Sequence, residues 1–302
     1  MVKKEHLDTI TSDHEKSLIK LGMALGLTIV FVLVEIVGGF LTNSLALLAD
    51  AGHMIQDTIA LMIATAAVLI AQRPKTPVFT FGYRRIEVVA AFTNALLLLV
   101  VGIVVFFEAT QRLGQEIEVN AGPMLVVAII GLLINLVVLI MMMDTRINSI
   151  NLRGAFLHVL SDAMGSLGAI IASILILTTG QMWWDPVASF FIAGMILLAG
   201  FRLIRESIHI LLEGAPENLN TGLIKESVEA ENGVLSVHDL HVWATSPGRC
   251  YLSCHVLVGE EEKNSSLLDR ITKVLRNKHH ITHVTVQIEQ IGDKICLEKD
   301  CA

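Results

Sequence analysis

The stretch SLALLADAGHMIQDTIALMIATAAVLIA, residues 44–71, is apolar over most of its length but contains His53 and Asp57. As a helix it is long enough to cross the hydrocarbon core of a bilayer, which takes about 20 residues. A separation of four residues places the imidazole and the carboxylate on the same face of such a helix. Ionisable groups at membrane depth are costly, so they usually face the interior of a helix bundle and serve ions, protons or paired contacts.

The same spacing recurs further along the chain in HVLSDAMGS, residues 158–166, where His158 and Asp162 lie inside another apolar run. One such pair alone is equally compatible with hydrogen bonding between helices. Because the pair is repeated, we predict a single four-ligand metal site formed by His53, Asp57, His158 and Asp162. Two imidazoles and two carboxylates suit tetrahedral Zn²⁺ and, less well, Co²⁺ or Cd²⁺.

Asp50, three residues before His53, lies on nearly the same helix face. It is either a group beside the ligands that orients them or handles protons, or a hydrogen-bonding residue near the start of the helix. An imidazole must be neutral to bind metal, so protons and metal compete for the same nitrogens near neutral pH. That competition suggests a mechanism by which metal is exchanged for protons.

The 302-residue chain is 53% hydrophobic and only 17% charged, and its mean hydropathy is +0.65. These values predict a polytopic α-helical membrane protein. The net charge of −7 argues against a nucleic-acid partner. The polar first residues contain no apolar core, so no cleaved signal peptide is expected. Six stretches can span a bilayer: residues 18–41, 45–71, 86–111, 121–143, 154–179 and 184–212.

Basic residues are unevenly distributed among the links between these stretches. They follow the second, fourth and sixth stretches, at Arg73, Lys75, Arg84, Arg85, Arg146, Arg153, Arg202 and Arg205. The short links after the first and fifth stretches contain none. Because basic residues favour the cytoplasmic side, both termini are expected in the cytoplasm, and the protein in the cell (inner or plasma) membrane.

Other polar residues lie among the spans but are not expected to bind metal. Glu35 and Glu108 are expected near a cavity or the membrane interfaces, and Asn94 and Asn135 in hydrogen bonds between helices.

From about residue 213 the apolar runs shorten and charges return. Helix patterns over residues 220–231 and 264–278 alternate with strand patterns over 234–244, 251–258 and 281–290. This αββαβ order predicts a small α+β domain with both helices on one face of the sheet. We therefore expect a cytoplasmic N-terminal segment (1–17), a six-span domain (18–212) and a cytoplasmic domain (213–302).

The last domain contains a second set of metal-binding residue types. His238 and His255 lie on adjacent predicted strands and could face each other, with Glu289 on the third strand and Cys296 or Cys301 closing from the tail. His241 is a reserve ligand. Cys250 and Cys254 are expected to be buried small residues, and no disulfide is expected in the cytoplasm.

Four segments together resemble the zinc-transporting members of the cation diffusion facilitator family, over essentially the full length of the chain. They are SLALLADAGHMIQD (44–57), FGYRRIEVVAAFTN (81–94), HVLSDAMGS (158–166) and VHDLHVW (237–243). The resemblance implies a homodimer that exports Zn²⁺ from the cytoplasm in exchange for protons, with a ferredoxin-like cytoplasmic domain. The four residues of the predicted membrane site match the family's transport site, and His53 in place of an Asp favours Zn²⁺ over Cd²⁺.

The resemblance also implies a cytoplasmic zinc site made of His238, His255, Glu289, Cys296 and Cys301. Two features of relatives are missing from this sequence. The link between the fourth and fifth spans, residues 144–153, has no His-rich stretch, and residues 71–85 contain no His, Asp or Glu for an additional site.

Two other classes of function remain to be weighed. An intramembrane metal-dependent hydrolase could also use His and carboxylate ligands, but the sequence contains no His-Glu-x-x-His pattern and no carboxylate obviously placed as a base. A membrane metal sensor would use the soluble domain as its output, but no catalytic or DNA-binding signature occurs there. An enzyme is therefore not expected.

Overall fold

The computed structural model describes residues 26–115, 117–143, 150–246, 248–259, 264–281 and 283–291, without the side chains of residues 141–143, 150–158 and 264. Contacts divide the chain into two compact units, residues 1–61 with 95–201 and residues 62–94 with 202–302. The first unit contains most of the apolar helices, and the second contains the α/β domain.

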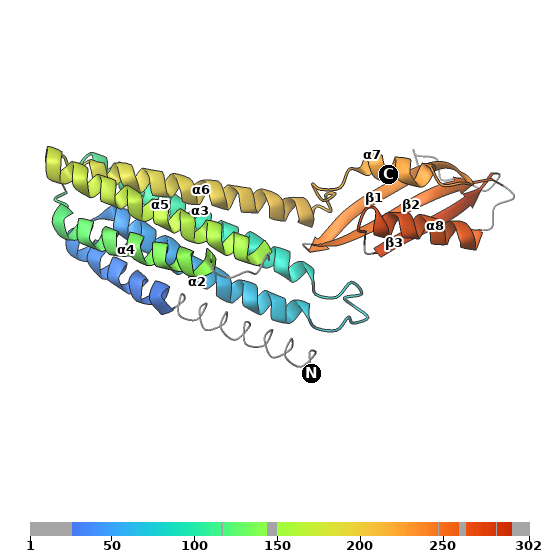
Figure 1. Cartoon of the computed structure of the whole chain (residues 1–302), viewed down its shortest axis with the longest axis horizontal. Helices are drawn as coiled ribbons and strands as arrows, with labels where there is room; N and C mark the ends of the chain where they lie inside the picture. The colour runs from blue at the N-terminus through green and yellow to red at the C-terminus, as the bar shows by residue number, and fades with distance from the viewer. Residues whose placement is uncertain are drawn as a thin grey trace, which may run out of the picture. The chain divides into compact units, whose positions relative to one another are not determined.

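Among the described residues, five helices are long and apolar enough to cross a membrane (Figure 1). They are α2 (Leu45–Ala71), α3 (Arg85–Leu113), α4 (Ala121–Met143), α5 (Ile150–Thr179) and α6 (Trp184–Leu211). A shorter apolar helix, described over Gly26–Thr42, precedes them. The helical membrane architecture is thus confirmed. The predicted boundaries agree within a few residues, and residues 18–25 of the first predicted span lie outside the described chain.

The buried carboxylate of Asp185, at the start of α6, is bonded to the start of α2. The Ser44 hydroxyl donates to Oδ1 at 2.6 Å, the Leu45 N–H donates to Oδ2 at 2.8 Å, and the Ala46 N–H donates to Oδ1 at 3.2 Å. The first N–H groups of a helix have no partner inside the helix, so Asp185 caps α2 from a neighbouring helix.

The Asp185 cap also determines the relative directions of the helices. It shows that α2 and α6 begin at the same end of the bundle. Helix α5 must end there too, since only residues 180–183 separate it from α6, and Gly180 ends α5 with a φ of +70°. Helices α2 and α5 are therefore antiparallel (Figure 1).

Close packing joins the first helix to α4 within the first unit. Phe31 is completely buried, and a Cβ atom added at Gly131 would overlap its ring. A Cβ at Gly38 would lie 2.9 Å from Val127 Cγ2. Small residues at such positions let helix backbones approach each other, which is the usual basis of helix association in membranes.

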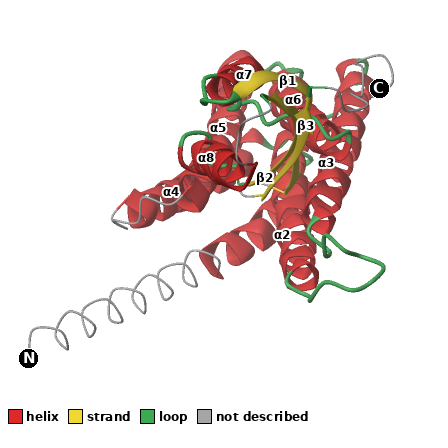
Figure 2. Cartoon of the chain, turned by 90° about the vertical axis from the view of Figure 1, so that its right-hand side faces the viewer, coloured by secondary structure: helices red, strands yellow, loops and turns green. Residues whose placement is uncertain are grey.

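The C-terminal α/β domain consists of α7 (Thr221–Glu229), β1 (Val234–Ser246), β2 (Arg249–Val258), α8 (Asn264–Asn277) and β3 (His283–Gln290). The sheet order is β1-β2-β3, with β1 and β2 antiparallel and β2 and β3 parallel. Helices α7 and α8 contact each other and the sheet, so both lie on one face (Figure 2). The Asn220 side chain accepts hydrogen bonds from Gly222 and Leu223 and caps α7. The αββαβ, ferredoxin-like arrangement is confirmed.

The two faces of the sheet differ in character. On β2, Leu252, Cys254 and Val256 are buried in the core formed with α7 and α8. Side chains alternate along a strand, so His255 lies on the opposite face, which neither helix covers. Glu289 is paired with Leu257 on β2 and shares that face. The domain therefore separates an apolar core from a face that contains titratable side chains.

We expect Gly131→Ala to lower the free energy of unfolding by about 1–3 kcal/mol, because the added methyl group displaces the buried Phe31 ring. Gly122→Ala is the matched control on the same helix, since nothing lies within 4 Å of its added Cβ, and its effect should stay within about 0.5 kcal/mol. Unfolding of the purified protein in detergent measures both. Equal stabilities of the two variants would contradict the close approach of Gly131 on α4 to the Phe31 ring.

We expect Asp185→Asn to cost about 1–3 kcal/mol of stability, since an amide NH₂ cannot accept the hydrogen bonds that one carboxylate oxygen receives. Glu108→Gln provides the comparison. Glu108 is half exposed, and its 3.2 Å ion pair with Arg112 should be worth less than about 1 kcal/mol. Thermal unfolding measures the stability of both variants. A larger loss of stability in Glu108→Gln than in Asp185→Asn would show that Asp185 does not cap α2.

Candidate functional site

Three of the four predicted membrane ligands lie close together. His53 Nε2 is 3.6 Å from Asp57 Oδ2, one turn later on α2, and 4.0 Å from Asp162 Oδ1 on α5. One ligand atom from each of these residues lies within 4.8 Å of the others, as a shared metal ion requires. His158 is in α5, one turn before Asp162, but its side chain is outside the described part of the chain.

Asp50 lies beside this group and contacts α5. Its side chain is 2% exposed, and a Cβ added at Gly165 would lie 2.7 Å from its Oδ1. The Ser166 hydroxyl donates to Asp50 Oδ2 at 3.5 Å, and Asn135 Nδ2 donates to Ser166 Oγ at 3.5 Å. Since α2 begins at Leu45, Asp50 does not cap the helix start. It connects α2 to α5 at the level of the ligands.

Glu35 is a nearby carboxylate that sequence reasoning did not include in the site. It is completely buried in the first helix, and it interacts electrostatically with Asp50 and Asp162. The sequence shows Glu35 as a single carboxylate in the middle of an apolar stretch. It has no His or Asp four residues away, the spacing by which the predicted ligands were recognised. Glu35 was expected near a cavity or a membrane interface, but in the structure it is fully buried near the Asp50 and Asp162 carboxylates.

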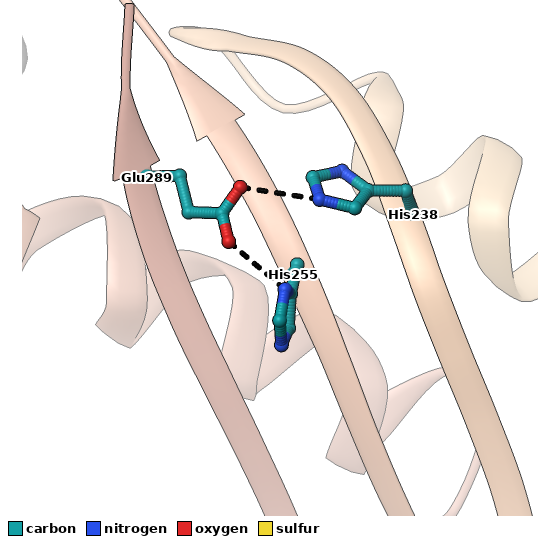
Figure 3. Close-up of side chains that lie close together, drawn as sticks. All are labelled: His238, His255 and Glu289. Carbon is teal, nitrogen blue, oxygen red and sulfur yellow. Dashed lines mark ion pairs between the residues drawn. The ribbon is translucent and has the colours of Figure 1, made fainter. Parts of the chain in front are cut away.

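A second group lies in the C-terminal α/β domain, on the sheet face that the helices leave uncovered. His238 on β1 is directly opposite His255 on β2, and Glu289 comes from β3. Figure 3 shows the two rings and the carboxylate converging from the three strands. His238 Nε2 is 3.1 Å from Glu289 Oε2, and His255 Nδ1 is 2.9 Å from Glu289 Oε1.

The geometry of this second group fits a cation. Within the described chain, His238 Nε2, His255 Nδ1 and Glu289 Oε2 are buried but have no hydrogen bond of good geometry. One ligand atom from each residue lies within 4.8 Å of the others. Buried polar atoms are nearly always hydrogen-bonded, so three converging nitrogen and oxygen atoms without such bonds form a set suited to Zn²⁺. Gln287 Nε2 donates to Glu289 Oε1 at 3.0 Å and orients the carboxylate.

The four cysteines divide into two groups. Within the described chain neither Cys250 nor Cys254 forms a disulfide; Cys250 is half-buried, and Cys254 is buried in the core on the face of β2 opposite His255. Burial, with the nearby Asp239 carboxylate adding to the effect, raises the pKa of Cys254 to about 12. Since the thiolate is the metal-binding form, Cys254 is a packing residue, as expected. Cys296 and Cys301 lie outside the described residues.

His241, the reserve ligand, is not part of the described cluster. Its ring is largely exposed, and its Nε2 lies 2.7 Å from Asp239 Oδ1. Asp239 also approaches His255, with 3.5 Å between Asp239 Oδ2 and His255 Nε2. Sequence reasoning missed Asp239, although it is the residue that follows His238 in the VHDLHVW segment.

Comparison with known proteins identifies related chains of similar length. The chain is 43% identical over 265 residues to the cadmium, cobalt and zinc/H(+)-K(+) antiporter of Bacillus subtilis, covering 86% of this chain and 85% of that protein. It is 39% identical over 301 residues to the zinc transporter ZitB of Escherichia coli, covering 98% and 95%. A solved structure, the metal-bound C-terminal domain of the CzcD transporter from Cupriavidus metallidurans, is 33% identical, with a TM-score of 0.23 over 24% of this chain and 99% of that one.

Two family profiles cover nearly all of the described chain. The cation efflux transmembrane domain matches residues 21–212, which include His53, Asp57 and Asp162. The cytoplasmic domain of cation efflux proteins matches residues 216–291, which include His238, His255 and Glu289. The chain, an integral membrane protein by its apolar helices, therefore belongs to the cation efflux (cation diffusion facilitator) family of metal transporters.

Proposed function

We propose that this protein is a Zn²⁺/H⁺ antiporter that exports zinc from the cytoplasm, with His53, Asp57, His158 and Asp162 as ligands of the transported ion. The observation that carries the proposal is the meeting of His53 and Asp57 with Asp162 across two antiparallel apolar helices. Metal held at that depth has to enter and leave across the bilayer, so transport is a more natural role than storage or catalysis. The relatives named for zinc, cadmium and cobalt support the same reading.

Charge balance supports exchange with protons. Asp57 and Asp162 can pair either with Zn²⁺ or with a protonated His53, whose Nε2 is 3.6 Å from the Asp57 carboxylate and 4.0 Å from that of Asp162. Metal binding requires the neutral imidazole, so loading displaces a proton and protonation displaces the metal. Asp50, bonded to α5 through Ser166, is proposed to orient α2 against α5 and to take part in handling protons.

The soluble domain is proposed to hold zinc as a resident, regulatory ion. His238, His255 and Glu289 would supply ligands, and Cys296 and Cys301 would complete the set from the tail. When bound there, zinc supplies a positive charge that draws the three strands' ligands together and stabilises this face of the sheet. We propose that zinc thereby brings together two copies of a homodimer and biases the transport helices.

The proposed arrangement in the membrane follows the distribution of basic residues. Residues 1–17 and 213–302 would lie in the cytoplasm, and residues 18–212 would form the transport domain. The cell membrane, inner or plasma, is the proposed location. Neither a hydrolase nor a sensor is favoured by any contact among the described residues.

Transport by reconstituted protein tests the membrane site. Changing a residue that only contacts a metal ligand typically lowers metal affinity about 10–100-fold. His53→Ala and Asp162→Ala each remove a proposed ligand itself, so in proteoliposomes with an imposed pH gradient we expect each to reduce Zn²⁺ flux by more than that factor. Glu108→Gln, which alters a half-exposed carboxylate on α3, should leave flux unchanged. Wild-type flux in both ligand variants would remove the site assignment. Cd²⁺, Co²⁺ and Mn²⁺ measured in parallel define the range of substrates.

Zinc titration of the full-length protein tests the cytoplasmic site. In a parent protein carrying His53→Ala and Asp162→Ala, the remaining zinc should bind to the soluble domain. We expect His238→Ala or Glu289→Ala to lower that affinity at least about tenfold, because each change removes a ligand. Replacing Cys296 and Cys301 with Ser measures the contribution of the tail. If the parent protein binds no zinc, the regulatory site does not exist.

A further inference from the structure

Strand β1 contains an extra residue beside the cytoplasmic cluster. His238 pairs with His255 and His241 pairs with Ser253, so three steps along β1 match two steps along β2. Asp239 lies within this bulge and has a φ of +48°. Residues other than Gly rarely adopt this left-handed backbone conformation, although Asp tolerates it better than most. Bulges often redirect a side chain toward a functional site, so the residues that the Asp239 side chain contacts indicate what this bulge does.

The carboxylate of Asp239 lies against the ring of His255. Asp239 Oδ2 is 3.5 Å from His255 Nε2, while the other ring nitrogen, Nδ1, is 2.9 Å from Glu289 Oε1. The side chains of Asp239 and His255 are 20% and 18% exposed, so both are largely shielded from water. The imidazole of His255 therefore lies between two carboxylates that come from different strands.

The two nitrogens of His255 have different surroundings and so different roles. Nδ1 is buried, without a hydrogen bond of good geometry in the described chain, and it lies 2.9 Å from Glu289 Oε1, while His238 Nε2 lies 3.1 Å from Oε2 of the same carboxylate. A neutral imidazole that binds metal through one nitrogen carries its proton on the other, and that N–H usually donates to a carboxylate or a carbonyl. If Nδ1 binds the metal, the proton is on Nε2. The carboxylate that faces this Nε2–H group is that of Asp239.

We propose that Asp239 is the positioning residue of the cytoplasmic zinc site, and that its carboxylate accepts the Nε2–H of His255 and thereby presents Nδ1 to the metal. Oδ1 of the same carboxylate holds the exposed ring of His241 at 2.7 Å, which accounts for the outward position of that histidine. The inference rests on the proposed zinc site but adds a residue outside its ligand set. It also explains the left-handed conformation of Asp239, because the bulge turns this side chain toward His255.

The test uses variants that preserve the backbone. Asp239→Gly permits the positive φ and removes the carboxylate, and Asp239→Asn also tolerates the conformation but leaves a neutral, weaker acceptor. Both are made in the full-length parent with His53→Ala and Asp162→Ala, so that binding reports on the soluble domain. Zinc affinity and stoichiometry are measured by competition with a chelator, and the melting temperature of the metal-free protein is recorded.

We expect Asp239→Gly to lower zinc affinity about 10–100-fold at unchanged stoichiometry, and Asp239→Asn to lower it less. His241→Ala should leave the affinity unchanged. Formate, a small carboxylate, should restore part of the affinity of Asp239→Gly without affecting the parent, an effect that a merely structural role would not produce.

Three results would overturn the proposal. Unchanged affinity in Asp239→Gly shows that the carboxylate does not position His255. A loss of zinc binding in Asp239→Gly as large as that in Glu289→Ala makes Asp239 a ligand and not a positioning residue. A parent protein that binds no zinc removes the cytoplasmic site itself, which separates failure of the site from failure of the role assigned to Asp239.

Discussion

The cost of placing charge inside a bilayer is the constraint on which the membrane domain depends. Carboxylates and imidazoles that cannot reach water must face one another, a counter-ion or a hydrogen-bond donor. His53, Asp57 and Asp162 meet this requirement together, and Asp50 meets it through Ser166 on α5. The same requirement that turns these groups inward would also make the proposed site for a divalent cation, so their burial and the proposed binding would have a single cause.

That site exists only if α2 and α5 are held in register. The Asp185 carboxylate fixes the start of α2 to the start of α6, directly after the end of α5. Gly165 on α5 leaves room for the Asp50 carboxylate, which a larger side chain would displace. A cap at one end and a close approach at Asp50, about a fifth of the way along α2, together define the height at which His53 meets Asp162. The proposed ligands are thus positioned by contacts that are not themselves part of the proposed site.

Local patterns predicted much of this arrangement. The four-residue spacing of His53 and Asp57 follows directly from helix geometry, and the alternating strands placed His238, His255 and Glu289 on adjacent strands of one sheet. What local patterns could not predict depends on contacts between distant residues. The bulge at Asp239 exists only relative to the register of β2, and the proximity of Glu35 to Asp50 depends on how the first helix packs. Cys296 and Cys301 remain a prediction.

Both proposed metal sites would follow one chemical scheme, in which imidazoles and carboxylates balance the charge of a cation that protons can replace. In the membrane this exchange would drive transport, so zinc movement and proton movement must be linked. The most direct measurement records Zn²⁺ uptake and internal pH together in proteoliposomes that start with a zinc gradient and no pH gradient. The account predicts proton movement opposite to zinc in a constant ratio. Zinc movement that leaves the internal pH unchanged would contradict it.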